Sequence, residues 1–99
     1  MSNARKHLEQ AIAINPAFAE AYFKLGLLQK QEGQRPEALA NFQKAVSLNA
    51  DFAEAQCELA IALAAHDDKE AARNHFLNAL EINPTYADAY YHYALLLVE

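Results

Sequence analysis

The chain has 99 residues, the length of a single domain, and a formal net charge of −5. This acidic balance argues against nucleic acid and an anionic membrane surface as partners, because both demand a basic face, and no apolar run approaches the roughly 18 residues of a membrane span. The single cysteine, Cys57, excludes an internal disulfide and a cysteine-based zinc site, so we expect a reducing or redox-indifferent setting and a cytoplasmic location.

The composition and the spacing of apolar residues predict an all-α chain. Hydrophobic residues make up 54% of it and Gly and Pro are few, which favours ordered helices. Gly33 supplies a left-handed stop after one helix, and Pro36 fits the first turn of the next. Asp67 is expected to adopt the same left-handed conformation, and Asp68 is a candidate N-cap for the helix that follows. Six helices are expected, over residues 3–14, 19–32, 36–48, 53–65, 69–82 and 87–98.

The sequence repeats itself with a period of 34 residues. INPAFAEAY at residues 14–22 returns as INPTYADAY at 82–90, and LNADFAEAQ stands halfway, at 48–56. Residues 19–52 and 53–86 are identical at the pairs Ala19/Ala53, Glu20/Glu54, Ala21/Ala55, Leu25/Leu59, Ala38/Ala72, Phe42/Phe76, Ala45/Ala79 and Asn49/Asn83. The period therefore divides the chain into a half repeat at 4–18, repeats at 19–52 and 53–86, and a half repeat at 87–99. No such unit could bury its apolar face alone, so stacking of neighbouring units is expected.

Each unit carries the same pattern of large and small residues. The first repeat has Tyr22, Leu25-Gly26 and Ala38-x3-Phe42, the second has Leu59-Ala60, Ala72-x3-Phe76 and Pro84, and the last half repeat has Tyr90, Tyr93-Ala94 and Leu97. In period and pattern, the chain resembles the tetratricopeptide repeat family over essentially its whole length. It departs from the pattern at Gln56, where an aromatic residue is usual, and at Ala50, where proline is usual. The resemblance implies a right-handed superhelical solenoid of antiparallel helical hairpins, forming one domain over residues 1–99.

The resemblance also implies a concave groove that binds a protein or peptide partner and is lined by the first helix of each unit. The groove residues it implies are Phe23, Lys24, Leu27, Lys30, Glu54, Cys57, Glu58, Ile61, Tyr91, His92 and Leu95. This set has an apolar floor and an acidic edge, which favours an apolar or amphipathic segment with a basic residue facing Glu54, Glu58 and Asp88. Alternatively, Glu20, Glu54 and Asp88 simply favour the positive end of a helix dipole. Glu58 lies in mid-helix and is not explained in that way.

One branch of the family binds the C-terminal carboxylates of heat-shock chaperones through Lys, Asn and Arg side chains in this groove. Here Phe23 and Leu27 occupy the places of the first Lys and Asn of that clamp. Glu58 and Asp88 would repel an acidic tail. We therefore expect that chaperone tails are not the partner.

The residues that could carry catalysis or bind a metal show no suitable pattern. No two of the four histidines, His7, His66, His75 and His92, share the i, i+4 spacing of a helical metal site. There is no Gly-rich phosphate loop and no G-x-S-x-G motif. The chain is expected to be non-catalytic and to need no metal or cofactor.

The last predicted helix exposes apolar residues that would normally be covered by a second helix. These residues are Tyr90, Tyr93, Leu96 and Leu97. Pairing with the first helix of another copy would give head-to-tail oligomers, and pairing with its last helix would give a closed dimer. Three interpretations thus stay open: a peptide-binding scaffold, a self-associating repeat unit whose groove is incidental, and an accessory segment of a larger enzyme.

Overall fold

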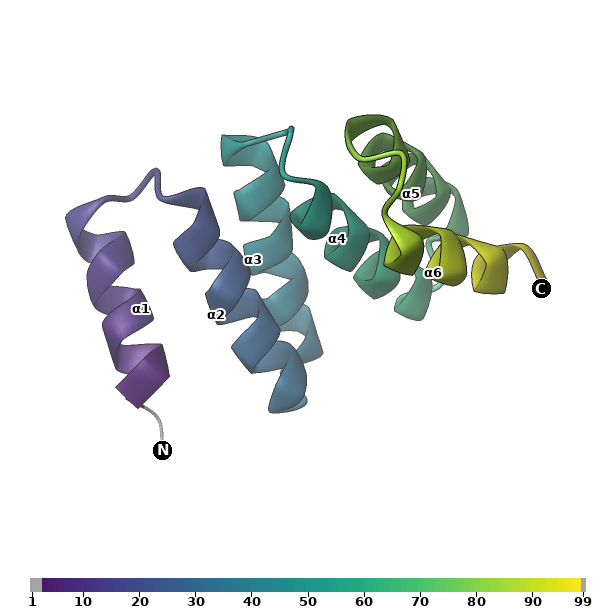
Figure 1. Ribbon diagram of the computed structural model, residues 1–99. Helices are drawn as coiled ribbons and strands as arrows, with labels where there is room; N and C mark the ends of the chain where they lie inside the picture. The colour runs from purple at the N-terminus through teal and green to yellow at the C-terminus, as the bar shows by residue number, and fades with distance from the viewer. Residues whose placement is uncertain (1–2, 99) are drawn as a thin grey trace. The chain divides into compact units, whose positions relative to one another are not determined.

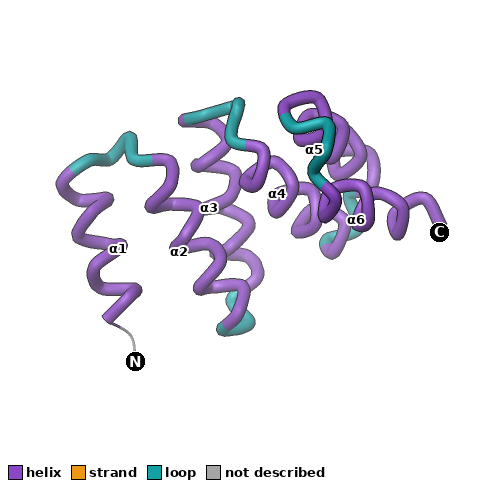
Figure 2. Tube along the Cα trace, in the orientation of Figure 1, coloured by secondary structure: helices purple, strands orange, loops and turns teal. Residues whose placement is uncertain are grey.

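The computed structural model describes residues 3–98, which form six helices and no strand (Figures 1 and 2). The helices are α1 (Asn3–Ile14), α2 (Ala19–Gln31), α3 (Arg35–Leu48), α4 (Ala53–Ala65), α5 (Lys69–Ile82) and α6 (Ala87–Val98). The all-α prediction is confirmed. Two bounds differ by one residue: α2 ends at Gln31, and α3 begins at Arg35, with Pro36 in its first turn.

The helices pack into two compact units, Met1–Asn49 and Ala50–Glu99. In the first unit, α2 packs against both α1 and α3, as Figure 1 shows. In the second unit, α5 packs against both α4 and α6, and α6 also touches α4. The assignment of residues 1–99 to one domain, with its half and full repeats, stays a prediction.

The tight turn inside each hairpin has the backbone that the sequence predicted. Gly33 has φ 79° and Asp67 has φ 67°, both in the left-handed region. Each turn is closed by the same hydrogen bond one period apart, from Gln34 N–H to Gln29 C=O and from Asp68 N–H to the Leu63 carbonyl. The Asp68 carboxylate also accepts a hydrogen bond from the Ala71 N–H (3.4 Å), which confirms Asp68 as the N-cap of α5.

The core of each hairpin is a small residue on one helix facing a large ring on the next. In the first unit, Gly26 of α2 lies so close to Phe42 of α3 that an added Cβ would stand 2.7 Å from its Cε1. In the second unit, Ala60 and Phe76 occupy the equivalent positions, and both are buried. Close approach of the helices therefore depends on the small residue in each pair.

One hydrogen bond is preserved where the second repeat departs from the family pattern. In the first unit, the Tyr22 hydroxyl donates to the carbonyl oxygen of Pro16 (3.0 Å). One period later, Gln56 Nε2 donates to the carbonyl oxygen of Ala50, also at 3.0 Å. Gln56 thus preserves the hydrogen bond that fixes the incoming loop to the helix, although its side chain is not aromatic.

Candidate functional site

The second unit contains a hollow between its three helices that brings together residues far apart in the sequence. Its volume is about 170 Å³, and it is lined by Ile61, Ala64, Lys69, Phe76, His92, Leu95 and Leu96. Three of these, Ile61 of α4 and His92 and Leu95 of α6, are residues for which the sequence predicted a binding role. The hollow lies where α4 and α6 meet, the two helices of this unit that were expected to line the groove.

Apolar surface extends from this hollow along α6. Tyr91 is 62% exposed and Leu95 is 49% exposed, while Ile61 is half-buried. The Tyr91 and His92 rings meet edge to face, with centroids 5.2 Å apart. Large exposed apolar groups next to a hollow can bury area against a partner at little cost in their own rearrangement.

Acidic side chains gather at the N-terminal ends of α4 and α6. Glu54 lies in the first turn of α4 and Asp88 in the first turn of α6. Burial raises the pKa of the Tyr86 hydroxyl, and the charges of Cys57, Glu54, Asp88 and Glu58 raise it further. The three carboxylates therefore lie close enough to Tyr86 for their charges to act on the same group.

Two predicted groove residues have little surface of their own. Phe23 is 7% exposed, and its ring stands 5.9 Å from that of Phe42. Cys57 is a free thiol and is 2% exposed. Both side chains lie beneath the surface, so the area that contacts a partner must come from their exposed neighbours. Sequence position alone could not reveal this, because burial depends on how the rings of the next helix pack.

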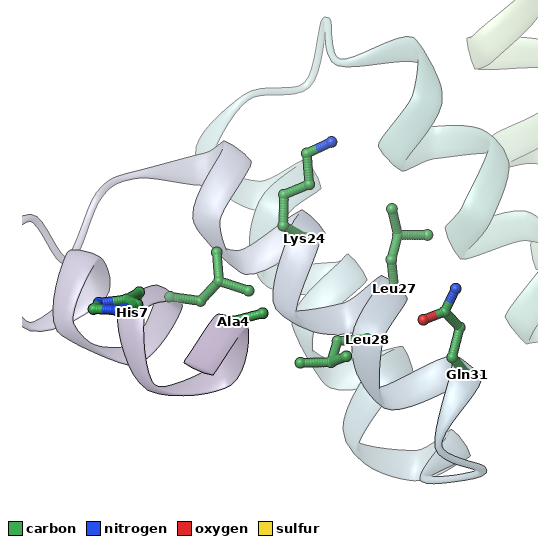
Figure 3. Close-up of a pocket in the computed structure, with 7 residues that line it drawn as sticks. Ala4, His7, Lys24, Leu27, Leu28 and Gln31 are labelled. Atoms are coloured by element: carbon green, nitrogen blue, oxygen red, sulfur yellow. The ribbon is translucent and has the colours of Figure 1, made fainter. Parts of the chain in front are cut away.

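The first unit contains a larger, open hollow between α1 and α2, about 490 Å³ in volume (Figure 3). It is lined by Ala4, His7, Leu8, Lys24, Leu27, Leu28 and Gln31. Lys24 and Leu27 were predicted as groove residues, but His7 and Leu8 of α1 were not. The signal was present in the repeat: Leu8, Lys24, Leu27 and Leu28 are two periods from Phe76, His92, Leu95 and Leu96 of the second hollow.

The remaining predicted residues lie at several depths. Lys24, Lys30 and Glu54 are exposed, and Glu58 is half-buried. Of the residues predicted for self-association, Tyr90 and Leu97 are exposed and Tyr93 and Leu96 are half-buried. The Tyr93 ring stands 6.0 Å from that of Phe76, and Leu96 lines the hollow of the second unit.

Within residues 3–98, no group of three or more His, Cys, Asp or Glu side chains could hold a metal ion. In the same range, no helix has both the length and the apolar character needed to cross a membrane.

Comparisons with known proteins give consistent matches. A family model described as TPR repeat matches residues 2–33 and 30–67, and one described as tetratricopeptide repeat matches residues 53–86. No curated protein sequence matches significantly.

Several solved structures have the same fold. MamA has a TM-score of 0.84 at 23% identity, over 93% of this chain and 54% of its own. An O-GlcNAc transferase of Thermobaculum terrenum has a TM-score of 0.86 at 27% identity, over 94% of this chain and 18% of its own. YrrB, described as a TPR protein with an unusual peptide-binding site, has a TM-score of 0.76 at 25% identity, over 88% of this chain and 45% of its own. The chain thus spans about half or less of each of these proteins.

Proposed function

The chain belongs to the tetratricopeptide repeat family, whose repeats are protein–protein interaction scaffolds, and we propose that its α4–α6 face binds an apolar or amphipathic peptide segment carrying a basic residue. The observation that carries the proposal is the exposure of Tyr91 and Leu95 beside the half-buried Ile61 and the hollow between the helices. A segment with two or three apolar side chains would cover these groups and displace water from them.

The acidic end of the same face supports a basic residue in the bound segment. Glu54, Glu58 and Asp88 act together on Tyr86, so a Lys or Arg side chain placed there would meet several carboxylates at once. An acidic tail would be repelled from the same place. The proposed partner is therefore a cationic amphipathic segment, and for the same reason we expect that chaperone tails do not bind here.

The comparison with YrrB adds a precedent for the kind of ligand. That protein is described as having a peptide-binding site, and its fold matches this chain with a TM-score of 0.76. The transferase match carries a different implication, because there the same fold is part of an enzyme. A role for this chain as the accessory segment of an enzyme is compatible with peptide binding at α4–α6, since such a segment would act by binding. That the chain has no catalytic site itself stays a prediction.

Fluorescence anisotropy with two labelled peptides tests the proposal. One peptide alternates leucine and lysine, and the other alternates leucine and glutamate. We expect the lysine peptide to bind, and Tyr91→Asp and Leu95→Asp each to raise its Kd about tenfold or more, because each places a charge in the apolar contact. Leu77→Asp is the matched control, since Leu77 is an exposed leucine on α5. Equal binding of both peptides, or an equal effect of all three substitutions, would contradict the proposal.

A further inference from the structure

Residues that are buried in α5 and α4 are less buried at the equivalent repeat positions of α1 and α6. On α5, which packs against α4 and α6, the residues Ala72, Phe76 and Ala79 are buried. Their equivalents on α1, two periods earlier, are Ala4, Leu8 and Ala11, and α1 contains no buried residue. α1 packs against α2 alone in its unit, so the face that α5 turns to α4 has no counterpart covering it among the described residues of that unit.

The exposed face of α6 is equivalent to the other side of the α4–α5 contact. Gln56, Ala60 and Leu63 of α4 are buried against its neighbours, of which α5 is the hairpin partner. Their equivalents on α6 are Tyr90, Ala94 and Leu97, all exposed, and Leu97 is 64% exposed. α6 thus carries the face that α4 turns to α5, and α1 carries the face that α5 turns to α4.

We propose that α6 of one copy packs against α1 of a second copy in the antiparallel register of the α4–α5 hairpin, giving head-to-tail assembly. In that register Ala94 faces Leu8 of the second copy, at the positions that Gly26 and Phe42 occupy in close contact in the first hairpin and the buried Ala60 and Phe76 occupy in the second. The small residue again meets a large one, which is the condition for close approach of two helices. The α6 residues of this contact, Tyr90, Ala94 and Leu97, are not those proposed to bind the peptide, so the proposal does not rest on peptide binding; Leu95, the equivalent of Ile61, borders the contact.

Polar groups and charges fit the same register. His75 Nδ1 lies 2.7 Å from Gln56 Oε1 across the α4–α5 hairpin. The equivalent pair is His7 of the second copy and the hydroxyl of Tyr90, which can form the corresponding hydrogen bond. The last turn of α6 has no basic residue, so the negative end of its dipole is uncompensated within the described helix. Antiparallel packing brings that end to the first turn of α1, where Lys6 is exposed.

Two exposed alanines, Ala94 and Ala4, allow the register to be blocked, and neither is a buried core residue, although Ala4 also borders the hollow between α1 and α2. Ala94→Phe and Ala4→Phe add apolar surface, which would strengthen a non-specific association but overfill the proposed contact. We expect each to raise the association Kd about tenfold or more. Ala40→Phe is the matched control, because Ala40 is an exposed alanine on α3 that takes no part in the contact.

Sedimentation velocity over a concentration series, with circular dichroism to verify folding, tests the proposal. The wild-type mass should rise with concentration beyond that of a dimer, since head-to-tail contacts do not close. Each blocked variant alone should stay monomeric. A mixture of the two should form a heterodimer and stop there, because the Ala94→Phe copy retains α1 and the Ala4→Phe copy retains α6. A wild type that stays monomeric, an Ala4→Phe variant that dimerises alone through α6, or an Ala94→Phe variant that associates as the wild type does would each overturn it.

Discussion

Gly26 and Phe42 are in such close contact that the space for a Cβ on Gly26 is already occupied by the ring. Substituting Gly26→Ala should therefore destabilise the α2–α3 hairpin by about 1–3 kcal/mol, the usual effect of overpacking, although alanine has the higher helix propensity. Urea unfolding followed by circular dichroism measures the change.

The ring also supplies the control for that experiment. Combining Gly26→Ala with Phe42→Leu shortens the side chain that the new methyl group meets. The double variant should lose less stability than the sum of the two single variants, because the two changes relieve each other. Simple additivity of the two effects would show that the contact is not what limits the size of residue 26.

His75 should make the stability of the second unit depend on pH. Burial lowers the pKa of His75 below its ordinary 6.5, so the unfolded chain takes up a proton at a pH where the folded chain does not. The contribution of this residue to stability is present above about pH 6.5 and is lost as the pH falls below it. Urea unfolding at several pH values between neutral and mildly acidic should show stability falling with pH.

The repeat itself suggests the control for His75. Asn41 occupies the equivalent position in α3, one period earlier, and cannot titrate in this range. His75→Asn should weaken the acid sensitivity, leaving a flatter dependence of stability on pH. An unchanged slope in this variant would assign the sensitivity to another group.

Gln56 should tolerate replacement only where its hydrogen bonds are replaced as well. Gln56→Leu would leave the Ala50 carbonyl oxygen without this donor and His75 without this partner, at a cost of about 1–3 kcal/mol. The double variant Gln56→Tyr/His75→Asn gives these two positions the residues of the first unit, Tyr22 and Asn41, and should recover the part of that loss that comes from the Ala50 carbonyl oxygen. Thermal unfolding of the single and double variants compares them, and a double variant less stable than Gln56→Leu would contradict the equivalence of the two units.

The carboxylates at the N-terminal ends of α4 and α6 have two possible roles, stabilising the helix dipole and binding the basic residue of a partner, and one substitution distinguishes them. If Glu54 serves only the helix dipole, Glu54→Gln should cost about 0.3–1 kcal/mol of stability and leave peptide affinity unchanged. If Glu54 also contacts the basic residue of the bound segment, Glu54→Gln should in addition weaken binding of the lysine peptide. This loss of affinity should be smaller at high salt. Glu20→Gln is the matched control, since Glu20 holds the same position in α2. Titration of the peptide at low and high ionic strength distinguishes the two roles.

Local signals in the sequence were sufficient for the helices and their turns. The left-handed residues Gly33 and Asp67 and the cap at Asp68 all depend on neighbouring positions in the chain. The site was predicted less completely, because exposure is a property of packing. Phe23 and Cys57 stand at positions that the resemblance assigns to the groove, but their side chains are buried. The hollow between α1 and α2 includes His7 and Leu8 of α1, a helix that was not expected to line the groove.

The central claim, that the α4–α6 face binds a cationic amphipathic segment, is tested most directly by nuclear magnetic resonance. Titrating the unlabelled leucine–lysine peptide into isotope-labelled protein reports which residues feel the ligand. We predict the largest saturable shifts at Ile61, Tyr91 and Leu95, with Leu77 of α5 unaffected. Shifts centred on other helices, or no saturable shifts at these three residues, would contradict the claim.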